Sequence, residues 1–170
     1  MQEGVYFFGG KNQKGELMNK LRYFKPVVID GKVVHGEFST IKASGEAPAP
    51  RFGHTMCHLP INSSLLIAGG RNDDMSKQNK TPFFNDLILF LLDQKVWLNV
   101  KYSVASERMD HIGNHCLGVV CDNENYEKVL IFGGIKNKVA EDVAEVTSHL
   151  SNSAYVITLN QRTNKSLFQK

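Results

Sequence analysis

The second half of the chain holds the closest grouping of side chains that commonly bind metal ions, namely His111, His115, Cys116 and Cys121. Imidazole and thiolate groups are the ligands that Zn²⁺ prefers. The surrounding run is apolar, however, and is typical of an extended strand, which advances about 3.3 Å per residue. Cys116 and Cys121 would then lie about 17 Å apart. We therefore expect neither a metal site nor a cofactor here.

Two segments begin with an arginine followed three residues later by a histidine. They are Arg51 with His54 and Arg108 with His111. Such pairs could grip an anionic ligand, but their recurrence favours a structural role, because a catalytic site usually occurs once. We expect the arginines to tie strand ends together and the histidines to hydrogen-bond the nearby backbone.

The usual catalytic signatures are absent from the sequence. It has no Walker loop, no Gly-x-Ser-x-Gly elbow, no His-Glu-x-x-His and no Gly-x-Gly-x-x-Gly. The acidic pairs Asp73-Asp74 and Glu141-Asp142 lie in polar loops and are typical of solvated charge. We therefore predict no catalytic residues and expect that the chain is not an enzyme.

Polar side chains directly follow three pairs of glycines. They are Lys11, Asn12, Arg71, Asn72, Asp73, Lys136 and Asn137. Side chains at equivalent places in a repeated fold lie on one surface, where these would suit charge-assisted hydrogen bonds to an acidic or extended peptide. We predict that they bind a protein partner. The alternative is a solvated surface without a ligand.

The glycine pairs themselves mark a repeat. Gly9-Gly10, Gly69-Gly70 and Gly133-Gly134 each close a short apolar run, at 5–8, 65–68 and 129–132. Runs this short, bounded by glycine, predict buried strands, and glycine permits the sharp turn that follows. We assign a structural role to all six glycines.

The stretch from Arg51 to Val100 contains four apolar runs separated by turn and loop signals, which predicts four antiparallel strands. Its last run carries Trp97, which we expect to pack inside the fold. Phe38 and Phe168 occupy matching places in the flanking segments. We predict that Phe38 also points inward.

This pattern resembles the kelch repeat: a diglycine ends the second strand, Asn85-Asp86 precedes the third, an aspartate-led turn follows at Asp93, and Trp97 lies in the fourth. Kelch repeats have a period of about 50 residues and form the blades of a β-propeller. The resemblance implies an all-β fold of four-stranded antiparallel units. Both flanking units have phenylalanine in place of tryptophan, and the third has Asn152-Ser153 in place of Asn85-Asp86.

The resemblance divides the chain into three units within one propeller segment, at residues 1–42, 50–100 and 107–170. The first unit lacks an opening strand. The third carries an insertion at 135–151, where apolar residues at 139, 143 and 146 predict a short helix. In this topology the loops 11–19, 71–83 and 135–151 gather on one face, the candidate working surface.

A propeller ring needs roughly four to eight blades. Three units would leave two sheet faces bare and one strand edge unpaired. We therefore expect the remaining blades to come from a longer chain, with a six-bladed ring of two copies as the alternative.

Composition favours an ordinary soluble domain. The net charge of +3 arises from scattered residues, and the apolar runs are too short to span a bilayer, so we expect neither nucleic acid nor membrane as a partner. Three cysteines and no signal pattern favour a reducing, cytoplasmic location.

The resemblance implies a non-catalytic protein-interaction or scaffold module, because kelch propellers commonly serve as adaptors. One alternative is the propeller portion of a larger enzyme, linked to a phosphatase or methyltransferase domain. Another is a structural subunit of a large assembly.

Overall fold

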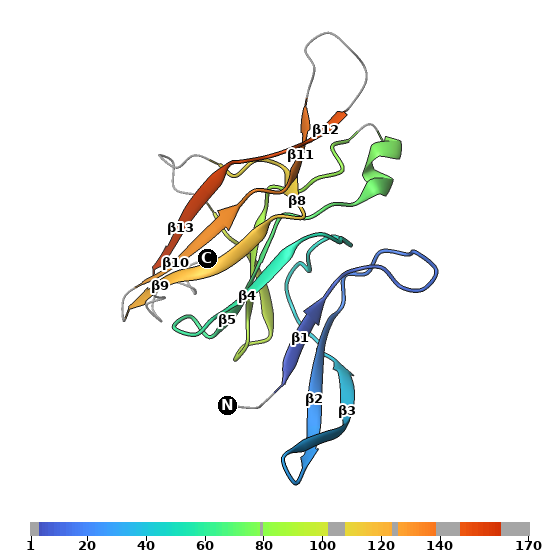
Figure 1. Ribbon diagram of the computed structural model, residues 1–170, viewed down its shortest axis with the longest axis vertical. Helices are drawn as coiled ribbons and strands as arrows, with labels where there is room; N and C mark the ends of the chain where they lie inside the picture. The colour runs from blue at the N-terminus through green and yellow to red at the C-terminus, as the bar shows by residue number, and fades with distance from the viewer. Residues whose placement is uncertain (1–3, 79, 102–107, 124–125, 139–146, 161–170) are drawn as a thin grey trace.

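The computed structural model describes residues 4–78, 80–101, 108–123, 126–138 and 147–160, and almost all of its regular structure is antiparallel β-sheet. Figure 1 shows three sheets stacked along the chain, which we call blades 1 to 3. Blade 1 contains β1 (Val5–Phe8), β2 (Leu21–Ile29) and β3 (Lys32–Thr40). Blade 2 contains β4 (Thr55–Leu59), β5 (Ser64–Ala68), β6 (Leu87–Leu91) and β7 (Val96–Asn99). Blade 3 contains β9 (Cys116–Asn123), β10 (Tyr126–Phe132) and β13 (Ala154–Asn160).

The strand order confirms the predicted all-β fold of antiparallel units. Blade 2 has all four strands in sequence order, β4-β5-β6-β7. Blade 1 has the order β1-β2-β3, without a strand before β1 in the described chain, and blade 3 has the order β13-β10-β9. The fourth strand predicted around Phe168 lies outside the described residues.

The insertion in the third unit differs from the predicted loop. A small additional sheet forms there from β8 (Ile112–Gly113), β11 (Ile135–Lys138) and β12 (Thr147–Leu150). The antiparallel pairing of β11 with β12 satisfies backbone groups that an extended loop would leave to water. The helix predicted at 139–146 lies outside the described residues. The loop after β5 contains a short 3₁₀ helix, η1 (Asp73–Gln78).

Two apolar cores hold the stack together. The core between blades 1 and 2 includes Phe8, Ile67 and Phe90, and the core between blades 2 and 3 includes Leu66, Leu89 and Ile131. Every residue of β5 is buried, because both of its faces are covered by neighbouring blades. A continuous apolar strand is what such double burial requires.

Trp97 lies in the first of these cores, against Phe90 and against Phe8 of blade 1, with ring centroids 4.7 and 5.5 Å away. Phe38 is its counterpart in blade 1, since Phe38 pairs with Phe24 at 4.8 Å just as Trp97 pairs with Phe90. The prediction that Phe38 points inward is wrong, because its side chain is 63% exposed. No described segment covers the face of blade 1 on which it lies.

The three long loops leave the blades at a common end. In Figure 1 the segments after β1 and β5 and the strands β11 and β12 lie at the upper end of their own sheets, and the turns at 30–31 and 60–63 lie at the lower end of theirs. We call the first end the loop rim and define it by residues 9–19, 51–54, 69–78, 80–86, 108–113 and 133–138.

Candidate functional site

The glycine pairs lie where one blade meets the next. Gly9 and Gly10 have φ values of 63° and 85°, and Gly69 and Gly70 have 53° and 100°, a backbone conformation that favours glycine. The N–H of the second glycine donates to a carbonyl of the following blade: Gly10 to Arg51 at 2.8 Å, and Gly70 to Ile112 at 2.8 Å. A methyl group on Gly9 or Gly69 would meet that same carbonyl, at 2.7 and 2.6 Å. Each pair thus forms a backbone clasp between neighbouring blades.

One histidine from the following blade lies against each clasp. The ring of His54 packs over Gly9, and the ring of His115 packs over Gly69. The Nε2 atom of His115 shares a 2.6 Å hydrogen bond with the hydroxyl of Thr55. These matching contacts make His115 the structural counterpart of His54.

The predicted match of Arg108 and His111 with Arg51 and His54 is therefore in the wrong register. Ile112, whose carbonyl accepts from Gly70, is the counterpart of Arg51. The hairpin of β9 and β10 is longer than that of β4 and β5 and contains a β-bulge, which shifts the sequence spacing between the histidine and the glycine pair. Arg108 is exposed, and the Nδ1 atom of His111 lies 2.8 Å from the carbonyl of Phe83.

Arg51 makes the most extensive polar contact network of blade 2. Its guanidinium, which is 1% exposed, donates to both carboxylate oxygens of Asp86 at 2.6 and 2.7 Å. It also donates to the carbonyls of Ala49 and Gly69 and stacks on the ring of Phe84. Because Gly69 belongs to the clasp, Arg51 holds the glycine pair in place from within its own blade.

In the third unit, neither residue of the Arg51–Asp86 ion pair has a charged counterpart. Ile112 lies where Arg51 lies, and Ser153 lies where Asp86 lies, since Gly133 donates to the Ser153 carbonyl as Gly69 donates to that of Asp86. Ile112 is fully buried. An apolar residue can occupy this place because no carboxylate is left unpaired opposite it.

Part of the predicted binding set converges on the loop rim around Phe52. The ammonium group of Lys11 lies 3.9 Å from the centroid of the Phe52 ring, and the guanidinium of Arg71 lies 5.3 Å from it. Both cations also face Asp73, at 3.9 Å for Lys11 and 2.6 Å for Arg71. Blades 1 and 2 thus place two cations around one ring and one carboxylate.

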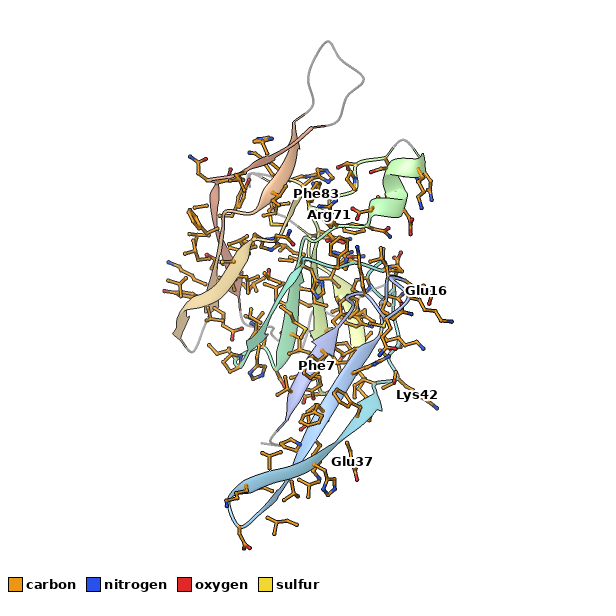
Figure 2. The ribbon with its side chains drawn as sticks, turned by 45° about the vertical axis from the view of Figure 1, so that its right-hand side comes forward. Phe7, Glu16, Glu37, Lys42, Arg71 and Phe83 are labelled. Atoms are coloured by element: carbon orange, nitrogen blue, oxygen red, sulfur yellow. The ribbon has the colours of Figure 1, made fainter. Side chains whose placement is uncertain are left out.

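A second cluster continues along the rim into blade 3. Arg71 also lies over the ring of Phe83, at 5.0 Å, and the Phe83 carbonyl meets His111. Next to His111, Asp110 accepts from the ammonium group of Lys136 at 2.7 Å. Figure 2 shows Arg71 and Phe83 side by side at this end of the molecule. The contacts form an unbroken series from Lys11 to Lys136 across all three blades.

The three asparagines of the predicted binding set, Asn12, Asn72 and Asn137, lie at other places on the loop rim than this series of contacts. Asn12 accepts from two backbone N–H groups of its own loop, and Asn72 accepts from the N–H of Asp74 and donates to the carbonyl of Pro50. These two side chains therefore shape the loops. Asn137 lies in β11, opposite Ser148.

Phe52, Phe83, Asp110 and Tyr155 join the rim network but were not predicted from the sequence. The N–H of Asp110 donates to the hydroxyl of Tyr155. Phe52 and Phe83 each directly pair with Arg71 through isolated β-bridges. Phenylalanines within an apolar segment give no signal of a surface role until the fold brings cations to their faces.

Burial sets the protonation of the clasp histidines. Burial lowers the pKa of His54 to about 4, with the positive charge of Arg51 and the neighbouring His115 adding to the effect. Burial alone lowers the pKa of His115 to about 4. Both rings are therefore neutral at pH 7.

Because the pKa values of His54 and His115 are lowered in the folded chain, the free energy of unfolding depends on pH. The unfolded chain binds these two protons near pH 6.5 and the folded chain only near pH 4, so protonation favours unfolding as the pH falls through this window. We expect the free energy of unfolding to be constant above pH 7 and to drop by on the order of 1–2 kcal/mol per histidine by pH 5, since part of the full effect is screened by solvent. Urea titrations at both pH values measure it. Replacing both histidines with asparagine should flatten the dependence, and an unchanged slope would contradict this assignment.

At the loop rim, the hydrogen bond from Lys136 lowers the pKa of Asp110. The same bond raises the pKa of Lys136. Both groups are charged at neutral pH.

The thiol of Cys57, in β4, is not a nucleophile at pH 7. Burial raises its pKa to about 12, and the nearby Glu127 adds to the effect.

Neither a metal centre nor a membrane span emerges from the residues described. No three of their His, Cys, Asp or Glu side chains are placed to hold an ion. No helix among them is long and apolar enough to cross a membrane.

Comparison with known proteins places this architecture in a family. The model of the KLHDC2/KLHL20/DRC7 Kelch-repeats domain matches residues 1–167. The chain therefore belongs to the kelch-repeat family, whose domains are generally protein-interaction modules without catalytic activity.

The chain is also similar to two particular proteins. It is 26% identical over 102 residues to the leucine-zipper-like transcriptional regulator 1 homolog of Drosophila melanogaster, and this match covers 60% of the chain and 9% of that protein. Among solved structures it is similar to YjhT, with 15% identity, a TM-score of 0.49, and coverage of 88% of this chain and 49% of that one. The chain thus spans about half the length of YjhT and a small part of the Drosophila protein.

Proposed function

We propose that the loop rim binds a protein partner through an acidic, extended segment, with the chain acting as a cytoplasmic scaffold module without chemistry of its own. The observation that carries the proposal is the convergence of Lys11 and Arg71 on Phe52. Two cations around one aromatic ring leave donors available to a carboxylate that approaches from solvent.

The charge balance of the rim supports an acidic ligand. Lys11, Arg71 and Lys136 face two carboxylates, Asp73 and Asp110. Asp73 is shared between two cations and its side chain is 48% exposed, so a ligand carboxylate can approach the same donors from solvent. The location of these groups on loops held by rigid sheets is typical of recognition sites.

The experiment is a selection of random peptides on the chain, followed by fluorescence anisotropy with the selected peptides. We expect enrichment of Asp and Glu, and at least a tenfold loss of affinity for Arg71→Glu and for Lys136→Glu, because each reverses a charge at the rim. Affinity should also fall as salt increases.

Lys32→Glu provides the matched control, since Lys32 is exposed at the β2–β3 turn, at the opposite end from the loop rim. It should retain the affinity of the unsubstituted chain. Equal affinities for Arg71→Glu and Lys32→Glu would place the binding surface elsewhere.

The outer faces of the stack support a further part of the proposal, that additional kelch blades pack on both sides. Phe7 and Phe38 are exposed on blade 1, and Phe132 and Val156 are exposed on blade 3. Figure 2 shows Phe7 on the sheet of blade 1. Apolar faces of this kind mark interaction surfaces. A longer chain or a second copy could supply the blades.

A further inference from the structure

Lys11 of blade 1 and Arg71 of blade 2 meet at one carboxylate, that of Asp73. Arg71 donates to a single oxygen of this carboxylate from two nitrogens, with Nε 2.8 Å and a terminal nitrogen 2.6 Å from Oδ1. The ammonium group of Lys11 lies 3.9 Å from the other oxygen, Oδ2. Asp73 therefore holds the contacts that a carboxylate of a bound ligand would make with the same two cations.

The internal repeat shows that an acid at this place is particular to the second unit. The third residue after the glycine pair is Gln13 in the first unit, Asp73 in the second and Asn137 in the third. Both counterparts of Asp73 are neutral amides. The acid thus occurs in the unit where the cations of two blades converge.

The contacts that position the two cations do not involve Asp73. The backbone of Arg71 exchanges two hydrogen bonds with Phe52, at 2.8 and 3.0 Å, and pairs with Phe83 through a second β-bridge. The guanidinium of Arg71 and the ammonium group of Lys11 both lie against the Phe52 ring, at 5.3 and 3.9 Å. Removing the charge of Asp73 therefore frees donors that are already in place.

Asp73 is held less firmly than the buried carboxylate partner of Arg51. It begins η1, a 3₁₀ helix without a buried residue, and its side chain is 48% exposed. In the Arg51–Asp86 pair, by contrast, the guanidinium is 1% exposed. An ion pair in contact with water contributes little to stability, so a second carboxylate can replace Asp73 without disturbing the sheets.

We propose that Asp73 is an autoinhibitory contact: its carboxylate occupies the place of a ligand carboxylate, and a bound partner displaces it from Lys11 and Arg71. This inference rests on the proposed function of the loop rim and adds what regulates it. Because η1 has no buried residue, Asp73 can leave the two cations without moving the core. It follows that Asp73 lowers the affinity of the rim for acidic segments.

The test measures binding of a defined probe, a capped tetraglutamate peptide, to the whole isotope-labelled chain by NMR titration. We expect Asp73→Asn to bind the peptide more tightly by about three- to tenfold, because the cations lose their internal partner. Asp73→Glu keeps the carboxylate and should keep the affinity of the unsubstituted chain.

Asp74→Asn is the matched control. It removes the same charge one residue away, but the Asp74 carboxylate is paired with Lys77, at 2.6 Å. Its affinity for the peptide should change by less than about twofold, since exposed charges at a distance are screened by salt. The comparison separates occupancy of the cation site from the overall charge of the chain.

The Nε–H resonance of Arg71 reports the exchange of partners directly. In the unsubstituted chain this group donates to Asp73 at 2.8 Å. In Asp73→Asn the resonance should move toward that of a free arginine, and adding the peptide should return it.

Two results would overturn the proposal, and they differ in what they leave standing. Equal affinities of Asp73→Asn and Asp74→Asn, with Arg71→Glu still weakening binding, would remove the autoinhibitory contact and keep the rim as the binding site. Failure of the peptide to bind Asp73→Asn, in which both cations are free, would overturn this inference and the proposed function together.

Discussion

Replacing Asp86 with serine should destabilise the protein by about 3–5 kcal/mol, because it leaves the buried guanidinium of Arg51 without its counter-ion. The reverse change, Arg51→Ile, should cost about 2–3 kcal/mol, since the Asp86 side chain is 32% exposed and water can partly replace its partner. Urea denaturation at pH 7 gives both values.

The double variant is the decisive control, because Arg51→Ile with Asp86→Ser copies the pair that blade 3 contains, Ile112 and Ser153. It removes both charges at once and should cost at least 2 kcal/mol less than the sum of the single changes. Additive losses would show that the ion pair does not act as a unit.

Gly70→Ala should have a similarly large effect, about 3–5 kcal/mol. The new methyl group would lie 2.8 Å from Cβ and 3.0 Å from the backbone nitrogen of His54, and φ is +100°. Backbone cannot move aside as the end of a flexible side chain can, so the strain adds to the cost of the left-handed conformation.

Gly10→Ala is the matched change in blade 1. Gly10 has the same place in its clasp and a φ of +85°, but nothing lies within 4 Å of the added methyl group. We expect about 1–2 kcal/mol, from the backbone conformation alone. Thermal or urea denaturation compares the two. Equal losses would contradict the packing of blade 2 against its own glycine pair.

The repeat in the sequence predicted most of the fold because each signal has a local cause. The glycine pairs, the short apolar runs and the Asp30-Gly31 turn depend on backbone conformation and burial within a few residues. Kelch-type blades therefore followed from sequence, and the cores between them confirm the arrangement.

The errors came from features that depend on contacts distant in sequence. Arg108 matches Arg51 by residue type, whereas the fold places Ile112 there, since a longer hairpin changes the spacing. Phe38 carries the signal of an inward aromatic, but inward burial needs a neighbouring blade. The strands of the 135–151 insertion lack apolar alternation and form by pairing with β8 and with each other.

The loop rim likewise combines features that the sequence predicted with features that depend on contacts distant in sequence. Lys11 and Arg71 were predicted because polar residues after a glycine pair must emerge at a strand end. Their convergence on Phe52 depends on how two blades stack, which spacing alone does not define.

Amide hydrogen exchange at the second glycine of each pair tests the central claim most directly, that clasps at Gly9-Gly10 and Gly69-Gly70 join each blade to the next. Gly10 and Gly70 donate across a blade boundary, whereas no carbonyl of a described residue accepts from Gly134. We predict slow exchange at Gly10 and Gly70 and fast exchange at Gly134, in the chain alone. Fast exchange at all three would contradict the account.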